Sequence, residues 1–283
     1  MSKEMRFGVL GGGSWATAIV KMLVENQDKV GWYMRNSDAV TYIKKEKHNP
    51  NYLTSVEFQT EQLHLTDDIN EVIATADVLV FAIPSAFLES ELKKVTVSLK
   101  DKIIFSAIKG IVPETGLIVG EHFNEKYDIP FENIGVITGP CHAEEVALER
   151  LSYLTIACEN QEMATYLAKA ISCRYIHTST SDDLFGTELS AILKNVYAVA
   201  SGICHGLGYG DNFQAVLIAA AIRETKSFID AVHPIHRDVN SSAYLGDLLV
   251  TAYSQFSRNR NFGSMVGKGY SVRSAQIEMN MVA

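Results

Sequence analysis

Short apolar runs alternate with segments of helical periodicity over roughly the first two thirds of the chain. Runs that are apolar at nearly every position are typical of strands in a parallel sheet that helices cover on both faces. We predict such strands at residues 6–10, 29–34, 78–83, 102–108, 134–138 and 154–158. Helices are predicted at residues 15–24, 38–45 and 85–99, with further helical stretches between the later strands. This order of elements predicts an α/β fold with a mostly parallel sheet.

The pattern changes after about residue 182, where strand signals end and Ala, Leu, Ile and Gly recur at helical spacing. Helical periodicity is clearest over residues 190–202 and 213–232, and another helix is expected to begin near Val272. The 283 residues are enough for two modest domains. We therefore predict an α/β domain over residues 1–181 and an all-α domain over residues 182–283.

Composition and charge exclude several classes of partner. Hydrophobic residues make up 47% of the chain and charged residues 20%, as in an ordinary globular protein. The net charge of −8 offers no electrostatic basis for binding nucleic acid, and no apolar run is long enough to cross a bilayer. We expect no nucleic-acid partner and no integral membrane segment, so a few placed cations must bind any anionic ligand.

The four cysteines are far apart in the sequence and include no C-x-x-C pair. This spacing argues against a disulfide framework and favours a cytoplasmic protein, and the N-terminus lacks the long apolar stretch of a signal peptide. Residues 141–145 and the pair His233 and His236 are the clusters to weigh as metal sites. Pro234 interrupts that pair, unlike the helical H-E-x-x-H spacing of a zinc protease, and we assign no metal.

A glycine-rich turn separates the first predicted strand from the first predicted helix. Residues 11–16 read Gly-Gly-Gly-Ser-Trp-Ala, a G-x-G-x-x-A pattern. Gly11 and Gly13 allow a tight turn and a close approach of the backbone to a pyrophosphate, and Ala16 lets the helix pack closely on the strand. A tight turn alone would also explain the glycines. The flanking strand and helix favour a Rossmann-like dinucleotide site.

Arg35 follows the second predicted strand, where an NAD-specific site usually carries an acidic residue. A guanidinium suits the 2′-phosphate of NADP and also stacks on adenine. The alternative is a solvated arginine in a loop. We predict NADP or NAD as the cofactor, with NADPH slightly favoured.

Lys194 is the one cation in the helical stretch of residues 188–202. Small and polar residues lie one turn away from it on the same face. A more apolar stripe lies beside that face and consists of Leu189, Leu193, Val196 and Ala200. A lysine among small residues can point into a cleft and act as a proton donor. The alternative is a lysine whose stem lies along the core while its ammonium reaches water.

Two further segments carry side chains suited to a phosphorylated substrate. Lys109 ends a predicted strand, which is where ligands bind in open α/β sheets. Arg258 lies in a Ser-Arg-Asn-Arg segment, whose guanidinium, hydroxyl and amide groups can hold a phosphate. Taken alone, this second segment is equally typical of a surface turn.

Together these segments resemble the NAD(P)-dependent glycerol-3-phosphate dehydrogenases of bacterial type, over residues 7–283. The motifs that carry the resemblance occur in the same order: Gly-x-Gly-Ser-Trp-x-Thr-Ala at 11–18, Asn-x-x-Tyr-Leu at 49–53, Pro-Ser at 84–85, Lys-Gly at 109–110, Gly-Pro at 139–140 with Ala-x-Glu at 143–145, Leu-Lys-Asn-Val at 193–196, Gly-Asp-Leu at 246–248 and Ser-Arg-Asn-Arg at 257–260. The resemblance implies a Rossmann-like NAD(P)-binding domain and a helical substrate-binding domain like the C-terminal domain of 6-phosphogluconate dehydrogenase. It implies reduction of dihydroxyacetone phosphate to sn-glycerol 3-phosphate for glycerophospholipid biosynthesis.

The resemblance also implies roles for individual residues. Lys194 matches the catalytic lysine and Asp247 the acid of the active-site network. Substrate-binding positions are matched by Lys109, Gly139, Cys141, Asn195, Thr251, Ser257, Arg258 and Asn259. Cofactor-binding positions, with Gly11 and Gly13 of the glycine-rich turn, are Ser14, Trp15, Arg35, Tyr52, Lys109, Ala143 and Arg258. We expect Lys194 to protonate the substrate carbonyl while Asp247 and Lys109 orient it.

The chain departs from the family pattern in three places. One is Ala16, which stands where Gly is usual and which the glycine-rich fingerprint tolerates. Cys141 and His142 stand where such enzymes usually carry Ser or Thr followed by Phe, and a thiol is a poorer hydrogen-bond donor than a hydroxyl. Similar proteins also continue past the position of Ala283 with a Glu-Gly-Tyr segment and further helices. We therefore expect the helical domain to lack a C-terminal portion.

Two rival functions stay open at this stage. A β-hydroxyacid dehydrogenase also joins a dinucleotide-binding domain to a helical domain with a lysine, but residues 257–260 suit a phosphate better than a carboxylate. A non-catalytic dinucleotide-binding sensor is the other, and the presence of both Lys194 and Asp247 argues against it. The expected ligand is a small phosphorylated ketone or alcohol, and a homodimer is compatible with the sequence.

Overall fold

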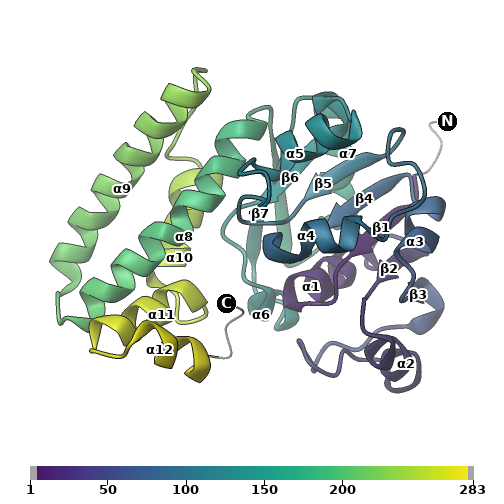
Figure 1. Ribbon diagram of the computed structural model, residues 1–283, viewed down its shortest axis with the longest axis horizontal. Helices are drawn as coiled ribbons and strands as arrows, with labels where there is room; N and C mark the ends of the chain where they lie inside the picture. The colour runs from purple at the N-terminus through teal and green to yellow at the C-terminus, as the bar shows by residue number, and fades with distance from the viewer. Residues whose placement is uncertain (1–4, 280–283) are drawn as a thin grey trace. The chain divides into compact units, whose positions relative to one another are not determined.

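The computed structural model describes residues 5–279, and the chain forms two compact units, Met1–Leu184 and Phe185–Ala283 (Figure 1). The strands found within residues 5–279 all belong to the first unit: β1 (Phe7–Leu10), β2 (Val30–Tyr33), β3 (Leu63–Thr66), β4 (Val78–Phe81), β5 (Ile103–Ser106), β6 (Ile134–Thr138), β7 (Ser152–Cys158) and β8 (Ile176–Ser181). Its helices are α1 (Ser14–Leu23), α2 (Ser37–Glu46), α3 (Ile69–Thr75), α4 (Ser85–Leu92), α5 (Val119–Tyr127), α6 (Ala143–Ala147) and α7 (Gln161–Ile171). Two 3-10 turns, η1 (Thr60–Gln62) and η2 (Phe131–Asn133), precede β3 and β6.

One sheet holds all of these strands, in the order β3-β2-β1-β4-β5-β6-β7-β8. The strands from β3 to β6 pair in parallel, β7 pairs antiparallel with β6, and β8 pairs in parallel with β7. The strand order reverses at β1, so the chain leaves β1 first toward β2 and later toward β4. In open α/β sheets this reversal opens a crevice at the carboxyl ends of the strands, which is where ligands bind.

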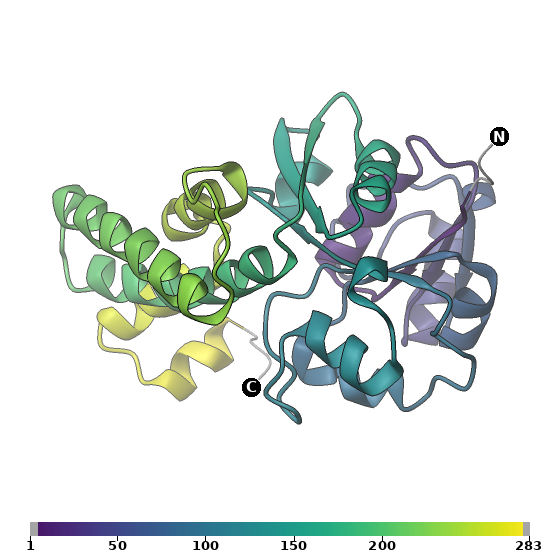
Figure 2. The same cartoon turned by 90° about the horizontal axis from the view of Figure 1, so that it is seen from above.

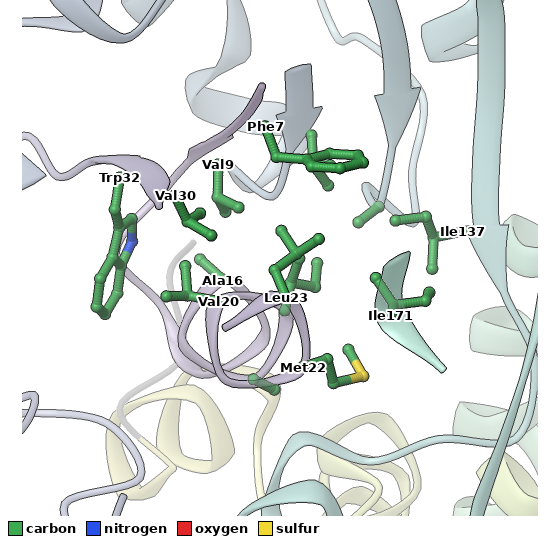
Figure 3. Packing of buried hydrophobic residues seen from close by; sticks show 14 of the residues in the cluster. Phe7, Val9, Ala16, Val20, Met22, Leu23, Val30, Trp32, Ile137 and Ile171 are labelled. Atoms are coloured by element: carbon green, nitrogen blue, oxygen red, sulfur yellow. The ribbon is translucent and has the colours of Figure 1, made fainter. Parts of the chain in front are cut away.

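The core of the first unit lies between the sheet and its helices. β1, β2 and β4 are buried at every position, which is why their sequences are apolar throughout. Figure 3 shows Ala16 and Val20 of α1 next to Val9 and Val30 of the strands. The small side chain of Ala16 is fully buried, as the close packing of α1 on the sheet requires.

The two edge strands, β3 and β8, are not predicted by the sequence pattern. β8 reads Ile-His-Thr-Ser-Thr-Ser, and only its first residue is buried. β3 is four residues long and begins directly after a 3-10 turn. Edge strands have one unpaired side and less cover, so they need neither length nor continuous apolar sequence. The predicted interior strands, by contrast, are confirmed.

The predicted helix over residues 85–99 is wrong in its second half, because α4 ends at Leu92. The side chain of Asn70, on α3, binds the backbone that follows. Its Nδ2 donates to the carbonyl oxygen of Lys94 at 3.1 Å, and its Oδ1 accepts from the N–H of Thr96 at 2.7 Å. These bonds pair backbone groups that a longer helix would have paired internally, so the tertiary contact replaces the last turns.

The second unit is helical over its described residues, with α8 (Leu184–Gly206) starting at the boundary between the units. The other elements are α9 (Asp211–Val232), a π turn η3 (Ser242–Gly246), α10 (Asp247–Tyr253), α11 (Arg258–Gly267) and α12 (Val272–Glu278). Figure 2 shows α8 and α9 as the two long green helices of this unit. The helices predicted over residues 190–202, 213–232 and from Val272 are confirmed.

Four glycines let α8 and α11 approach until their backbones touch. A Cβ on Gly263 would lie 2.1 Å from the carbonyl oxygen of Val199, and one on Gly202 would lie 2.0 Å from that of Arg260. Gly206 and Gly267, one turn further along each helix, meet in the same way. Both helices therefore carry a Gly-x-x-x-Gly spacing, which permits close helix crossings because it removes side chains from one face.

We expect Gly263→Ala to destabilise the helical unit, since no side-chain rotation can relieve a clash with backbone. In an open helix the same change would stabilise by about 1 kcal/mol, whereas here overpacking should cost about 1–3 kcal/mol. Gly210→Ala is the control, because a Cβ at Gly210 meets no atom within 4 Å. Thermal and urea unfolding of both variants would test this, and a Gly263→Ala protein as stable as the parent would contradict the close crossing.

Candidate active site

The glycine-rich turn after β1 has one tightly packed glycine and one open glycine. Gly11 has φ +139°, and a Cβ on it would lie 2.4 Å from the carbonyl oxygen of Ala82. A Cβ on Gly13 would meet no atom within 4 Å. The indole Nε1 of Trp15 is buried and has no hydrogen-bond partner within residues 5–279. The turn therefore has free space and an unused donor, which fits a bound dinucleotide.

Lys109 and Trp15 come together from two loops at the carboxyl edge of the sheet. Lys109 follows β5, and Trp15 lies in the first turn of α1, which follows β1. The Lys109 ammonium lies 5.5 Å from the centroid of the Trp15 ring, a cation–π distance. A cation is thereby held beside the glycine-rich turn, where a phosphate or a polarised carbonyl would need one.

Arg35, which follows β2, is exposed but held in place by α4. Its guanidinium carbon lies 4.8 Å from the centroid of the Phe87 ring. The same helix is bound to β2 by a hydrogen bond that the buried Tyr33 hydroxyl donates to Glu91. Burial, together with Glu91, raises the pKa of the Tyr33 phenol, so this donor stays protonated. The exposed Arg35 guanidinium is thus held in place by Phe87, on a helix that is itself bound to β2.

Lys194 and Asp247 form a buried ion pair between α8 and α10. Their side chains are only 5% and 3% exposed, and the Lys194 ammonium contacts a carboxylate oxygen of Asp247. Asp247 begins α10 directly after the π turn η3, and π turns often occur at functional sites. The Thr251 hydroxyl, which is buried, donates to the Asp247 carbonyl oxygen at 2.7 Å. The alternative of an ammonium in water is therefore wrong for Lys194.

The buried face of α8 is its small and polar face. The apolar stripe that includes Leu189, Leu193, Val196 and Ala200 is not that face, because Val196 is 60% exposed and the other three are only partly buried. The residues of α8 that are buried, apart from glycines, are Leu184, Thr187, Glu188, Ser190, Ala191, Lys194, Ala198 and Ser201. A helix that buries hydroxyls and charges in place of leucines must pair them, and such paired polar interiors are typical of functional sites.

Ser257, Arg258 and Asn259 lie at the N-terminus of α11. The buried Ser257 caps the helix by accepting from the N–H of Arg260 at 3.3 Å, which leaves its own hydroxyl proton to donate. Arg258 is exposed, and its Nη2 donates to the carbonyl oxygen of Met279 at 2.9 Å. A helix N-terminus with a hydroxyl, a guanidinium and an amide fits an anionic group.

The remaining predicted residues lie in loops around the sheet and on α8. Gly139 directly follows β6 and has φ +117°, and a Cβ there would lie 2.8 Å from the carbonyl oxygen of Tyr153. Cys141 is buried in the loop after it, and the buried Ala143 begins α6. Tyr52 is 45% exposed, and Asn195 is partly exposed beside Lys194.

The sequence reading of the site missed Phe87 and Asn49. Phe87 supports Arg35, and an isolated aromatic residue on a helix carries no signal of that role. Asn49 is fully buried and bonds to the glycine-rich turn, and the Asn-x-x-Tyr-Leu motif at residues 49–53 was a signal for it. No group of three or more His, Cys, Asp or Glu side chains suited to a metal ion occurs within residues 5–279. In the same part of the chain, no helix is long and apolar enough to cross a membrane.

Two family models match almost the whole chain. The model of the NAD-dependent glycerol-3-phosphate dehydrogenase N-terminus matches residues 6–164, and that of the C-terminus matches residues 183–283. The chain belongs to the NAD-dependent glycerol-3-phosphate dehydrogenase family. The resemblance seen in the sequence motifs and the expected class of enzyme, an NAD(P)-dependent oxidoreductase, are therefore confirmed.

Curated members of the family resemble this chain over nearly its full length. The glycerol-3-phosphate dehydrogenase [NAD(P)+] of Macrococcus caseolyticus is 32% identical over 280 residues, which are 98% of this chain and 84% of that protein. The enzyme of the same name from Syntrophotalea carbinolica is 35% identical over 283 residues, covering 99% of this chain and 84% of that protein.

Solved structures of glycerol-3-phosphate dehydrogenases share the fold. The one from Coxiella burnetii is 26% identical, with a TM-score of 0.88 over 99% of this chain and 85% of that chain. The one from Plasmodium falciparum is 22% identical, with a TM-score of 0.87 over 97% of this chain and 80% of that chain. The predicted fold class, a Rossmann-like sheet followed by an all-α segment, is confirmed.

The Lys194–Asp247 pair should show strong coupling in a double-mutant cycle. We expect Asp247→Leu to cost about 3–5 kcal/mol in unfolding free energy, because it leaves a buried ammonium without its counter-charge. Replacing both partners, in Lys194→Met/Asp247→Leu, should cost much less, since no buried charge is left. Urea unfolding of the parent and the three variants measures the coupling. A double variant as unstable as the sum of the two single variants would show that the pair is not coupled.

Proposed function

We propose that this protein reduces dihydroxyacetone phosphate to sn-glycerol 3-phosphate with NADPH or NADH, and so serves glycerophospholipid synthesis. The observation that carries the proposal is the buried Lys194–Asp247 pair, in a chain whose curated relatives are named glycerol-3-phosphate dehydrogenase [NAD(P)+]. A buried charge pair is costly to a fold, and a proton-transfer reaction is a reason to hold one.

Lys194 is the proton donor of this proposal. Its ammonium donates a hydrogen bond to the substrate carbonyl oxygen, polarises the carbonyl and passes a proton to the oxygen as the carbon is reduced. Asp247 holds the ammonium in place through their buried ion pair. Thr251 steadies the backbone of Asp247, and Asn195, the next residue after Lys194, offers an amide to the substrate hydroxyl.

The chain as a whole is acidic, so a phosphate must be bound by individual cations and by the N-terminus of a helix. We assign this role to Ser257, Arg258 and Asn259 at the N-terminus of α11. Lys109 would serve substrate and cofactor together, and Gly139 and Cys141 would line the substrate side. The thiol of Cys141 is a weak donor, so its contribution is contact rather than a strong hydrogen bond.

A bound nicotinamide cofactor supplies the hydride. Gly11, Gly13, Ser14 and Trp15 would hold its pyrophosphate, and the open space at Gly13 and the buried Trp15 Nε1 support this assignment. Arg35 would bind the adenosine end, where its guanidinium favours the 2′-phosphate of NADPH. The further contacts assigned to the cofactor are Tyr52, Lys109, Ala143 and Arg258.

This proposal divides the work between two domains. Residues 1–181 form the cofactor-binding domain and residues 182–283 the substrate-binding domain, which supplies the proton donor and the phosphate-binding residues. Contacts also cross this division, since Arg258 is assigned to the cofactor and Lys109, Gly139 and Cys141 are assigned to the substrate. A cytoplasmic location follows from the cysteine spacing, and a homodimer is the assembly that we would test first. The two rivals, a β-hydroxyacid dehydrogenase and a cofactor-binding sensor, predict turnover of 3-oxo acids and no turnover, respectively.

The decisive test is Lys194→Met beside Lys194→Arg, with NADPH oxidation followed at 340 nm, the nicotinamide absorbance. Both variants should lower kcat for dihydroxyacetone phosphate by about 10²–10⁴-fold, because Met has no proton and Arg holds its proton too tightly. The Arg variant keeps a charge opposite Asp247, so its loss is not attributable to unfolding. Lys226→Met is the matched control, since Lys226 is a half-exposed lysine paired with Asp230 in the same unit.

Three outcomes of this assay separate the candidate functions. Turnover of dihydroxyacetone phosphate that falls in both Lys194 variants supports the proposal. A parent that reduces only 3-oxo acids supports the β-hydroxyacid alternative, and one that binds NADPH without turnover supports the sensor. Full activity of the Lys194 variants would remove Lys194 from the mechanism.

The cofactor preference rests on Arg35. We expect Arg35→Ala to raise the Kd of NADPH by about 10-fold or more and that of NADH by much less, since only NADPH offers a 2′-phosphate. Arg174→Ala is the matched control, because Arg174 also lies over a ring, that of Tyr175, in the same unit. Fluorescence titration with both cofactors measures the effect, and equal losses for the two would contradict the assignment.

A further inference from the structure

Three buried side chains bond to successive carbonyl groups of the glycine-rich turn. The indole Nε1 of Trp32 donates to the carbonyl oxygen of Gly11 at 2.8 Å. The amide Nδ2 of Asn49 donates to that of Gly12 at 3.2 Å, and the hydroxyl of Thr17 donates to that of Gly13 at 2.9 Å. The three side chains come from β2, from the loop after α2 and from α1, and each is fully buried.

Fixing these carbonyls also fixes the N–H groups of the turn. In a trans peptide unit the C=O and the following N–H point in opposite directions. Holding the carbonyls of Gly11, Gly12 and Gly13 therefore aims the N–H groups of Gly12, Gly13 and Ser14 away from the three donors. None of these N–H groups donates a hydrogen bond within residues 5–279. N–H groups without a protein acceptor at the start of a helix are donors that can bind a phosphate.

Asn49 is the centre of this arrangement. Its second amide hydrogen is donated to the Thr17 hydroxyl oxygen at 2.9 Å, so it supports the bond from Thr17 to Gly13 as well as its own. Its Oδ1 accepts from the N–H groups of Asn51 at 3.0 Å and Tyr52 at 3.2 Å. Both donors and both acceptor sites of the amide are thus used, which no other side chain of this size could do.

We propose that Asn49, with Thr17 and Trp32, is a positioning residue that holds the glycine-rich turn in the conformation that binds the cofactor pyrophosphate. Three consecutive glycines have wide conformational freedom, and ordering them at the moment of binding would weaken affinity. The buried bonds order the turn beforehand. This inference rests on the proposed function, and it adds residues that touch the turn and not the cofactor.

Two substitutions test the proposal. Asn49→Leu removes the amide, and Thr17→Val removes one hydroxyl at nearly constant shape. We expect each to raise the Kd of NADPH by about 10-fold or more. This is the loss expected when N–H groups that bind a charged pyrophosphate are no longer held in place. Thr17→Ser retains the hydroxyl and should bind NADPH within about twofold of the parent. The kcat at saturating substrates should change little, because Lys194 and Asp247 belong to the other unit.

Adenosine 2′-monophosphate separates positioning from a general loss of structure, because it has the adenosine and the 2′-phosphate but no pyrophosphate. Calorimetric titration should show that Thr17→Val weakens NADPH binding and leaves this fragment within about twofold. Asn26→Leu is the structural control, since the Asn26 amide also donates to two backbone carbonyls, of Ala170 and Ser172, away from the turn. It should leave both ligands unaffected.

The outcomes distinguish this inference from the proposed function. Equal losses of NADPH and of the fragment in Thr17→Val, or unchanged NADPH binding in both Thr17→Val and Asn49→Leu, would overturn the positioning role while the parent still turns over substrate. A parent that binds neither NADPH nor NADH would overturn both. Selective loss of NADPH, restored in Thr17→Ser, supports the role.

Discussion

The shared direction of the strands from β3 to β6 is the constraint on which the sheet unit depends. Parallel strands cannot be joined by tight turns, so each connection crosses a face of the sheet, usually as a helix, and both faces become buried. The carboxyl ends of β1, β2, β5 and β6 then open at one edge. Loops that are far apart in the sequence bring the glycine-rich turn, Arg35 and Lys109 to this edge, so the site follows from the sheet.

The sequence predicts the interior of this sheet well because burial on two faces demands apolar strands. It does not predict the edges, where β8 carries Ser and Thr at exposed positions. It also overextends α4, since the local pattern of residues 85–99 is helical while Asn70, distant in the chain, binds the backbone at Lys94 and Thr96. Local periodicity contains no information about such a partner.

In the helical unit, motifs are informative and hydrophobic periodicity is not informative about which face is buried, unlike in the sheet unit. The motifs identify Lys194 and Asp247, but hydrophobicity indicates the wrong face of α8, because that helix buries Thr187, Glu188 and Ser190. A buried polar face is stable only when each group has a partner on another helix. Ser201 illustrates this, since its hydroxyl donates to Gln214 on α9 and lies 3.0 Å from the carbonyl oxygen of Ala252 on α10. Which partner meets which residue depends on the tertiary structure alone.

The backbone contact between α8 and α11 has a consequence for evolution within this fold. Gly202 meets Arg260 and Ser264, and Gly206 meets Ser264 and Gly267, so the two helices run in the same direction. Counted back along both helices from this contact, Lys194 lies within about one helical turn, roughly 5 Å, of the level at which α11 begins. The offset between the two helices is set by contacts between main-chain atoms, and these contacts do not change when side chains elsewhere are substituted. The side chains around the proposed substrate site can therefore diversify while the distance along the helix axes between Lys194, the proposed proton donor, and the N-terminus of α11, the proposed phosphate site, stays constant.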